Sequence, residues 1–236
     1  VEERHKRGVS FKNMYAFTEK ADVYGDISPE TGLGIPLFNP IPAGAMKMRV
    51  LRIPNVILEI DVCCRRTDFT RFSYSDYHEL CAKRLMYAGG KGFVNIRDFT
   101  TAMLEAPDEV LRFVAYFASL PDEVRPLGIA MEDPTGGTRP DVLGLWTAAV
   151  RQVMDEEGWA EGHWLIHTHY IYGLAEAMVQ SFLSMGGTGI WCAVTREGAA
   201  TGHACSLTTL TNLARLGNTS VTSMYNMPAL RKAAIE

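Results

Sequence analysis

The stretch Trp164–Val194 reads WLIHTHYIYGLAEAMVQSFLSMGGTGIWCAV, and its pattern decides the fold class. It predicts three consecutive elements: an apolar strand at 164–167, a helix at 174–185 closed by a glycine pair, and a second buried strand at 189–194. His167 and His169 lie two residues apart where the first strand ends, so their side chains point to the same side. Candidate ligands at the carboxyl end of a strand, in a strand–helix–strand unit, are typical of an α/β barrel.

The same alternation continues towards both ends of the chain. Strands are predicted at 50–53, 56–63, 92–97 and 126–131, and helices at 76–87, 106–120, 140–157, 206–216 and 228–235. Strand–helix pairs about 30 residues long indicate parallel βαβ units. An open doubly wound sheet satisfies the same pattern, but the residues at the strand ends favour a (β/α)8 TIM barrel with an incomplete or atypical first βα unit.

The first 45 residues differ from the rest. Within Asp26–Gly44 lie four prolines and several glycines, a density of helix and strand breakers that predicts a long irregular arm. The predicted domains are therefore an irregular N-terminal arm at 1–45 and a barrel domain at 46–236. Such an arm on a barrel protein leads us to expect a homo-oligomer, with a dimer as the simplest case.

Composition excludes several function classes. The chain has 236 residues, 47% of them hydrophobic and 21% charged, which is ordinary for a globular protein. A net charge of −4 without a basic, aromatic-rich run argues against a nucleic-acid surface. No apolar stretch approaches the roughly 20 residues that span a bilayer, and no signal-peptide core is present, so no membrane partner is expected. The odd number of cysteines, five, predicts a reducing compartment, the cytoplasm.

Four successive predicted strands end in ionisable side chains. The carboxyl ends of parallel strands meet at one edge of the sheet, so we expect that edge to be functional. The four strand ends are Arg97-Asp98, Glu132-Asp133 with Thr135, His167-Thr168-His169, and Arg196-Glu197 followed by Gly202-His203 and Cys205.

The two histidines of the third strand end predict a metal site. Two neutral imidazoles that converge on one point are half of a divalent metal site. His203 is a third candidate, because the positive end of the helix that follows it would lower its pKa and keep it neutral. Cys205 in the same loop is either a low-pKa thiol or a small buried residue. Asp133 lies too far ahead of the helix that begins at Pro140 to cap its first turn.

From about Ser75 to Leu230 the chain resembles the metal-dependent TIM-barrel lyases and synthases. This family includes hydroxymethylglutaryl-CoA lyase, the isopropylmalate, homocitrate and citramalate synthases, and the carboxyltransferase domain of pyruvate carboxylase. The segments that carry the resemblance are Ser75-Asp76-Tyr77-His78, Asn95–Phe99, Glu132–Gly136 with Pro140, His167-Thr168-His169 with Gly173-Leu174-Ala175, Arg196–Ala199 with Gly202-His203, and Tyr225–Leu230.

The chain also departs from the family pattern. The arginine–aspartate pair that the family carries on its first strand is not found in residues 1–60. His203 stands where the family has an asparagine ligand, and Tyr170-Ile171-Tyr172 replaces the polar residues that usually follow the histidine pair. These differences predict a more aromatic pocket beside the metal.

The resemblance implies carbon–carbon bond formation or cleavage through a metal-stabilised enolate. The substrate would be a 2-oxo acid or an acyl-CoA, and the cofactor a divalent metal (Mg, Mn, Co or Zn) on His167, His169 and His203. From their positions at the strand ends, we expect catalytic roles for Asp98, Asp133, Arg97, Glu197 and Tyr170, and substrate contacts from Arg196, Thr135 and Cys205. Two alternatives remain open: a non-catalytic structural or regulatory barrel, and a metal-dependent hydratase or hydrolase on the same scaffold.

Overall fold

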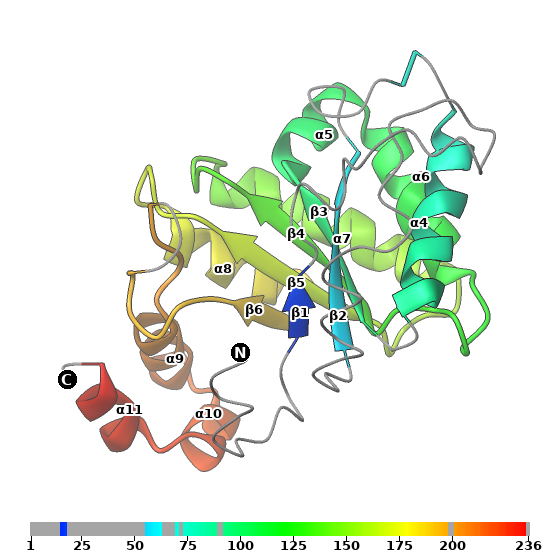
Figure 1. The fold of residues 1–236 in the computed structure, drawn as a ribbon. Helices are drawn as coiled ribbons and strands as arrows, with labels where there is room; N and C mark the ends of the chain where they lie inside the picture. The colour runs from blue at the N-terminus through cyan, green and yellow to red at the C-terminus, as the bar shows by residue number, and fades with distance from the viewer. Residues whose placement is uncertain are drawn as a thin grey trace. The chain divides into compact units, whose positions relative to one another are not determined.

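The computed structural model describes residues 15–17, 55–62, 69–70, 73–88, 92–197 and 201–234 (Figure 1). The strand predicted at 50–53 lies outside these residues, and so does nearly all of the predicted arm. Contacts between residues divide the chain into two compact units, Val1–Ala130 with Val153–His163 and Met131–Gln152 with Trp164–Glu236.

The first unit is a parallel sheet with helices between its strands. Backbone pairing joins β1 to β2 and β2 to β3 in parallel, and Leu127 donates to Gly92 at 2.8 Å where β4 begins beside β3. Its elements are β1 (Tyr15–Phe17), β2 (Asn55–Asp61), α4 (Tyr74–Ala88), β3 (Phe93–Arg97), α5 (Phe99–Glu105), α6 (Pro107–Ala118) and the start of β4 (Gly128–Asp133).

Aromatic residues form the core of this unit. Phe99, Phe113 and Phe117 are fully buried, and the last two rings lie 4.7 Å apart between centroids. Helix α4 packs against β2 and α6, and the hydroxyl of Tyr77 accepts a 2.9 Å hydrogen bond from the backbone N–H of Asp61 at the end of β2. Together these contacts fix the strand end that carries Asp61.

The second unit repeats the same arrangement. The backbone N–H of His169 donates to Asp133 at 2.9 Å, which places the end of β4 beside the end of β5, and β5 pairs with β6 in parallel. Its elements are the end of β4, most of α7 (Pro140–Glu156), β5 (His163–Thr168), α8 (Ala175–Ser184), β6 (Gly189–Trp191), α9 (Ser206–Arg215), α10 (Thr219–Met224) and α11 (Met227–Ala233).

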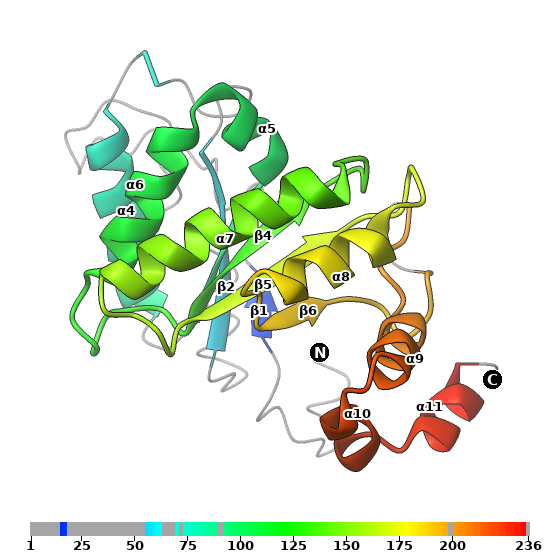
Figure 2. The ribbon, with the colours of Figure 1, turned by 180° about the vertical axis from the view of Figure 1, so that it is seen from behind.

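Helices α7 and α8 lie side by side on one face of the strands of this unit (Figure 2). The hydroxyl of Ser181 on α8 donates to the backbone carbonyl of Pro140 at 2.5 Å, which ties the two helices together. Beneath α8, Trp164 of β5 packs against Phe182 with ring centroids 5.5 Å apart, and both side chains are fully buried. The opposite face of the strands is the one on which the histidines converge.

Most predicted elements are found, with three informative differences. Strand β4 extends to Asp133, two residues beyond the predicted end, because its last residues pair with the segment that follows β5. Strand β6 ends at Trp191 instead of 194, because the backbone of Ala193 bonds to Ala204 in the following loop and to Ser206 at the start of α9. A short strand, β1, lies inside the range that was predicted to be an irregular arm.

Two short helices, α5 and α10, were not predicted from the sequence. Helix α5 begins directly after β3, because Asp98 adopts a left-handed conformation (φ 48°) that turns the chain at once from strand to helix. Helix α10 is a six-residue turn of helix capped by the side chain of Asn218, which accepts from the backbone N–H groups of Ser220 and Val221. Helices this short carry too little periodicity to be recognised in a sequence.

Parallel strands that alternate with helices confirm the α/β class. The described residues contain six strands, fewer than the eight of a complete barrel. None of the helices in the described part of the chain is both long enough and apolar enough to cross a membrane.

Candidate metal centre

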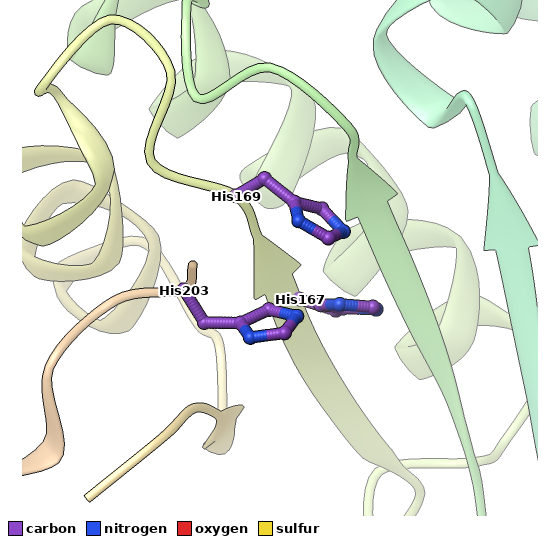
Figure 3. Close-up of side chains that lie close together, drawn as sticks. All are labelled: His167, His169 and His203. Carbon is purple, nitrogen blue, oxygen red and sulfur yellow. The ribbon is translucent and has the colours of Figure 1, made fainter. Parts of the chain in front are cut away.

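Three histidines from two segments of the second unit converge on one point (Figure 3). His167 is in β5, His169 follows it, and His203 lies in the segment that leads into α9. One ring nitrogen from each lies within 4.8 Å of the others, and all three residues are buried. The sequence motifs predict this triad as the set of metal ligands, and the structure brings its three members together.

The backbone holds the two segments in register. His169 and His203 form an antiparallel bridge, and the N–H of Ala204 donates to the carbonyl of Thr168 at 3.2 Å. The ring centroids of His169 and His203 are 4.5 Å apart as a result. A loop that returns beside the end of β5 therefore supplies the third ligand.

His167 has both ring nitrogens buried without a hydrogen-bond partner. Burial, reinforced by the neighbouring His169 and His203, lowers the pKa of His167 to about 3, so its ring is neutral near pH 7. A buried polar atom without a partner costs about 1–3 kcal/mol. A metal ion would satisfy one of these nitrogens, and it requires the neutral form of the ring.

The pKa of His203 is also lowered, but the cause differs from the prediction. Burial is the main cause and the neighbouring His169 the second. Helix α9 begins at Ser206 and is capped by Cys205, so His203 lies outside the first turn, where a helix dipole acts most strongly. The expected neutral state of His203 is found, and burial accounts for it.

The turn after β4 is shaped to fit against His169. A β carbon at Gly136 would lie 2.0 Å from the backbone oxygen of His169, and φ at Gly136 is +63°. Only glycine combines this conformation with such a close approach. The backbone N–H of Ile171 donates to the carbonyl of Thr135 at 2.9 Å, which fixes the chain just beyond His169 against the same turn.

Asp133 organises this turn. Its carboxylate accepts bonds of 2.8–3.3 Å from the backbone N–H groups of Thr135, Gly136 and Thr138 and from the hydroxyls of both threonines. The side chain is fully buried. These contacts account for an aspartate here as a structural residue, and the catalytic role of Asp133 and the substrate contact of Thr135 stay predictions.

A second glycine, Gly202, allows a similar close approach of two backbone segments beside His203. A β carbon at Gly202 would lie 2.1 Å from the backbone oxygen of Arg196, and φ at Gly202 is +87°. That same oxygen accepts a 3.0 Å hydrogen bond from the N–H of His203. The close approach of the two chain segments at Gly202 therefore positions the third histidine.

Arg196 is exposed but held in place. Its Nε donates to Glu176 at 3.2 Å, and its guanidinium carbon lies 4.5 Å from the ring centre of Tyr170. The same carboxylate of Glu176 accepts from the backbone N–H of Cys205 at 3.3 Å. Tyr170 and Arg196, predicted as site residues from separate motifs, are thus in contact.

Two further predicted site residues of this unit, Cys205 and Glu197, make hydrogen bonds within the protein. The thiol of Cys205 caps α9 by accepting from the N–H of Thr208 at 3.4 Å, which accounts for its burial. Glu197 is exposed, and a hydrogen bond from the side chain of Thr195 lowers its pKa. Their expected roles in substrate binding and catalysis stay predictions.

Arg97 and Asp98 belong to the first unit. The guanidinium of Arg97 is buried between two carboxylates of β2, with Nε 3.2 Å from Asp61 and one terminal nitrogen 3.4 Å from Glu59. Asp98 is buried and holds its left-handed conformation at the start of α5. The roles predicted for both stay predictions.

Two residues beside the triad were not among the predicted site residues. The ring of Trp191 in β6 stacks on His167, and Glu132 in β4 places Oε1 3.8 Å from Nε2 of His169. The sequence signal for Glu132 was incomplete, because strand alternation decides which residues of β4 share a face, whereas the register with β5 decides which of them lies beside the histidines.

The donor set fits a divalent transition metal. Three imidazoles with ring nitrogens within 4.8 Å of one another could hold Zn, Co or Mn, and such an ion would bind a nitrogen of His167, whose two ring nitrogens have no hydrogen-bond partner. Mg prefers oxygen ligands, so the three histidines fit it less well than the other three predicted ions.

No model of a protein family matches the chain, and no curated protein matches its sequence. Solved structures do. HMG-CoA lyase from Pseudomonas aeruginosa is 21% identical (TM-score 0.59) over 80% of this chain and 64% of its own. HMG-CoA lyase from Acinetobacter baumannii, in complex with coenzyme A and 3-methylmalate, is 16% identical (TM-score 0.56) over 79% and 65%. The carboxyl transferase domain of Rhizobium etli pyruvate carboxylase, with pyruvate and biocytin, is 13% identical (TM-score 0.60) over 93% and 33%.

These similarities match the resemblance found in the sequence motifs. The chain spans slightly less than two thirds of the length of the two lyases named above. At identities of 13–21% the agreement concerns the fold. The chain has the fold of the TIM-barrel lyases that include HMG-CoA lyase and the carboxyltransferase domain, and within the described residues it forms part of such a barrel.

Proposed function

We propose that this chain is a divalent-metal-dependent carbon–carbon lyase or synthase whose metal is held by His167, His169 and His203. The observation that carries the proposal is the buried triad, with both nitrogens of His167 lacking a hydrogen-bond partner. A structural barrel has no reason to keep three imidazoles together at that cost. The fold supports the proposal, because HMG-CoA lyases and a carboxyltransferase domain share it.

The substrate class that we propose is a 2-oxo acid or an acyl-CoA. The structurally similar carboxyl transferase domain was solved with pyruvate, a 2-oxo acid, and one similar lyase with coenzyme A. When bound, the metal supplies Lewis-acid stabilisation of negative charge on a carbonyl oxygen of the substrate. That charge develops when a bond to the carbon next to the carbonyl is made or broken.

Residues around the triad would bind the substrate and move its proton. Glu176 holds Nε of Arg196 at 3.2 Å, so the guanidinium is oriented and its terminal nitrogens can bind a carboxylate in a bidentate manner. Tyr170 lies under that guanidinium. Its phenol is a candidate for proton transfer to a substrate bound by Arg196.

Metal content is the first test. We expect about one divalent ion per chain in the purified protein, measured by mass spectrometry, and loss of the ion in the double variant His167→Ala/His169→Ala. His163→Ala, at an exposed histidine of the first unit, is the matched control and should retain the ion. Stoichiometric metal in the double variant contradicts the proposed site. No metal in the wild type after soaking with Mn, Co or Zn contradicts the proposal and favours the non-catalytic alternative.

Proton exchange then tests the reaction class. We expect the metal-loaded protein to exchange the C3 protons of pyruvate with deuterated solvent, or the α protons of an acyl-CoA, followed by NMR. The all-histidine donor set also suits a metal-dependent hydratase or hydrolase, in which an ion activates water. Stoichiometric metal without exchange in any 2-oxo acid or acyl-CoA would favour that second function. A cytoplasmic location and a homo-oligomeric state remain predictions.

A further inference from the structure

Glu132 lies directly beside the histidine pair on the neighbouring strand. The hydrogen bond from the N–H of His169 to the carbonyl of Asp133 fixes the parallel register, and this register places Glu132 opposite His167. Residues opposite one another on neighbouring strands project to the same face of the sheet. The side chain of Glu132 therefore lies on the face where the histidines converge.

The carboxylate is close to one particular nitrogen. Oε1 of Glu132 lies 3.8 Å from Nε2 of His169, and the two side chains are only 15% and 11% exposed. The ring of His169 extends from the end of β5 towards β4, the strand that carries Glu132 (Figure 3). The adjacent acid, Asp133, projects to the other face and is engaged by the turn. Glu132 is thus the acid of this strand end that is directed at the triad.

A histidine that binds a metal must present an unprotonated nitrogen, and its other nitrogen then carries the proton. The partner of that second nitrogen decides which tautomer forms and how the ring is oriented. Three neutral imidazoles also leave both charges of a divalent ion without compensation. A nearby carboxylate that is not itself a ligand meets both needs in many metal sites.

We propose that Glu132 is a positioning residue for the metal: its carboxylate accepts the Nε2–H of His169 and so presents Nδ1 to the ion. This inference rests on the proposed metal function of the triad. The 3.8 Å separation is longer than a hydrogen bond, and a small rotation of the Glu132 side chain closes it. Glu132 belongs to one of the predicted strand ends but was given no role there, so its assignment to His169 comes from the geometry of the structure.

Cobalt binding tests the assignment without any assay of turnover. The protein is freed of metal by a chelator, titrated with Co(II), and followed by its visible absorption bands, with the chelator as a competitor to fix Kd. We expect Glu132→Ala to weaken Co(II) binding about 10- to 100-fold, the range found for such partners. Glu132→Gln, whose amide oxygen still accepts a hydrogen bond, should weaken it less. The shape of the absorption bands should stay that of the wild type, because Glu132 is not a ligand.

Glu176→Gln is the matched control, because it removes a carboxylate of similar burial from the same unit. The side chain of Glu176 is 12% exposed, and one oxygen, Oε1, accepts the bonds from Arg196 and from the backbone of Cys205. Glutamine retains that oxygen, so we expect wild-type affinity for Co(II). Thermal unfolding of each metal-free variant shows whether it is folded. Glu132→Gln, which is close in shape to the native side chain, keeps the test decisive where Glu132→Ala does not fold.

The outcomes separate this inference from the proposed function. Wild-type affinity in both Glu132 variants overturns the positioning role and leaves the metal site intact. An altered band shape in Glu132→Gln overturns it differently, by showing that Glu132 is itself a ligand. A wild-type protein that binds no Co(II) overturns the proposed function and this inference together.

Discussion

The ring of Trp191 stacks on the ring of His167, with centroids 4.4 Å apart and an angle of 22° between the planes. The two residues face each other because β5 and β6 pair in parallel, with His167 opposite Trp191. The indole therefore covers one face of the imidazole whose nitrogens lack hydrogen-bond partners. This contact gives the proposed site a built-in optical reporter.

We expect Co(II) to quench the fluorescence of Trp191, because a paramagnetic ion bound to His167 would lie within a few ångströms of the indole. The chain has four tryptophans, so the quenched component must be assigned by substitution. Trp191→Phe keeps an aromatic ring on His167 and should remove most of the quenching. Trp146→Phe, in α7, should retain it. Equal quenching in both variants would place the ion elsewhere.

Gly136 gives a sharp test of how backbone shape supports the metal site. Alanine at Gly136 would drive its β carbon to 2.0 Å from the carbonyl of His169, so the turn or the histidine must move. We expect Gly136→Ala to lower metal affinity at least tenfold, measured by Co(II) titration, besides costing about 1–2 kcal/mol of folding free energy.

Gly158 is the matched control for Gly136. It has φ +75°, but a β carbon there would meet nothing within 4 Å. Gly158→Ala should therefore carry the conformational cost alone and leave Co(II) affinity unchanged. If the two variants bound Co(II) equally, the contact between Gly136 and His169 would not support the site.

The sequence predicted the class of fold and the triad, and the reasons are physical. His167 and His169 are two apart on an apolar strand, a pattern that depends only on local geometry. His203 could be predicted as the third ligand because parallel strands bring their carboxyl ends to one edge of the sheet. The helix bounds at α7 and α8 were within about one residue of prediction, since long amphipathic periods and glycine breaks are local signals.

The rest of the site depends on pairings that no local pattern encodes. Glu132 was predicted at the end of the strand at 126–131, and only the register of β4 with β5 places it beside His169. Trp191 looked like an ordinary apolar strand residue, and only the pairing of β5 with β6 stacks it on His167. The structural roles of two predicted site residues were not visible in the sequence either. Asp133 accepts hydrogen bonds within the turn after β4, and Cys205 caps α9.

Asp98 provides a test of backbone strain at the end of β3. Its φ of 48° is the one positive value at a non-glycine residue in the described part of the chain. Aspartate and asparagine tolerate this conformation, whereas β-branched residues do not. We expect Asp98→Thr to be less stable than Asp98→Asn by about 1–2 kcal/mol, measured by urea unfolding. Equal stability of the two variants would mean that the turn relaxes without cost.

The buried histidines predict how stability depends on pH in the metal-free protein. Burial lowers the pKa of His167 to about 3, and burial together with the charge of Arg112 lowers that of His78 to about 4. An unfolded histidine has a pKa of about 6.5, so between these values the unfolded chain binds more protons than the folded one. The free energy of unfolding is therefore highest above about pH 6.5 and falls as the pH decreases towards about 4.

Each histidine that stays neutral in the fold contributes a slope of about 1.4 kcal/mol per pH unit within that window. We expect urea unfolding of chelator-treated protein to show this loss between about pH 6.5 and pH 4.5. His167→Gln removes one proton-binding group from the unfolded chain and should make the slope shallower by about that amount. His163→Gln, at an exposed side chain, is the control variant. An unaltered slope in His167→Gln would show that His167 is protonated in the folded protein, a state in which it cannot bind a metal.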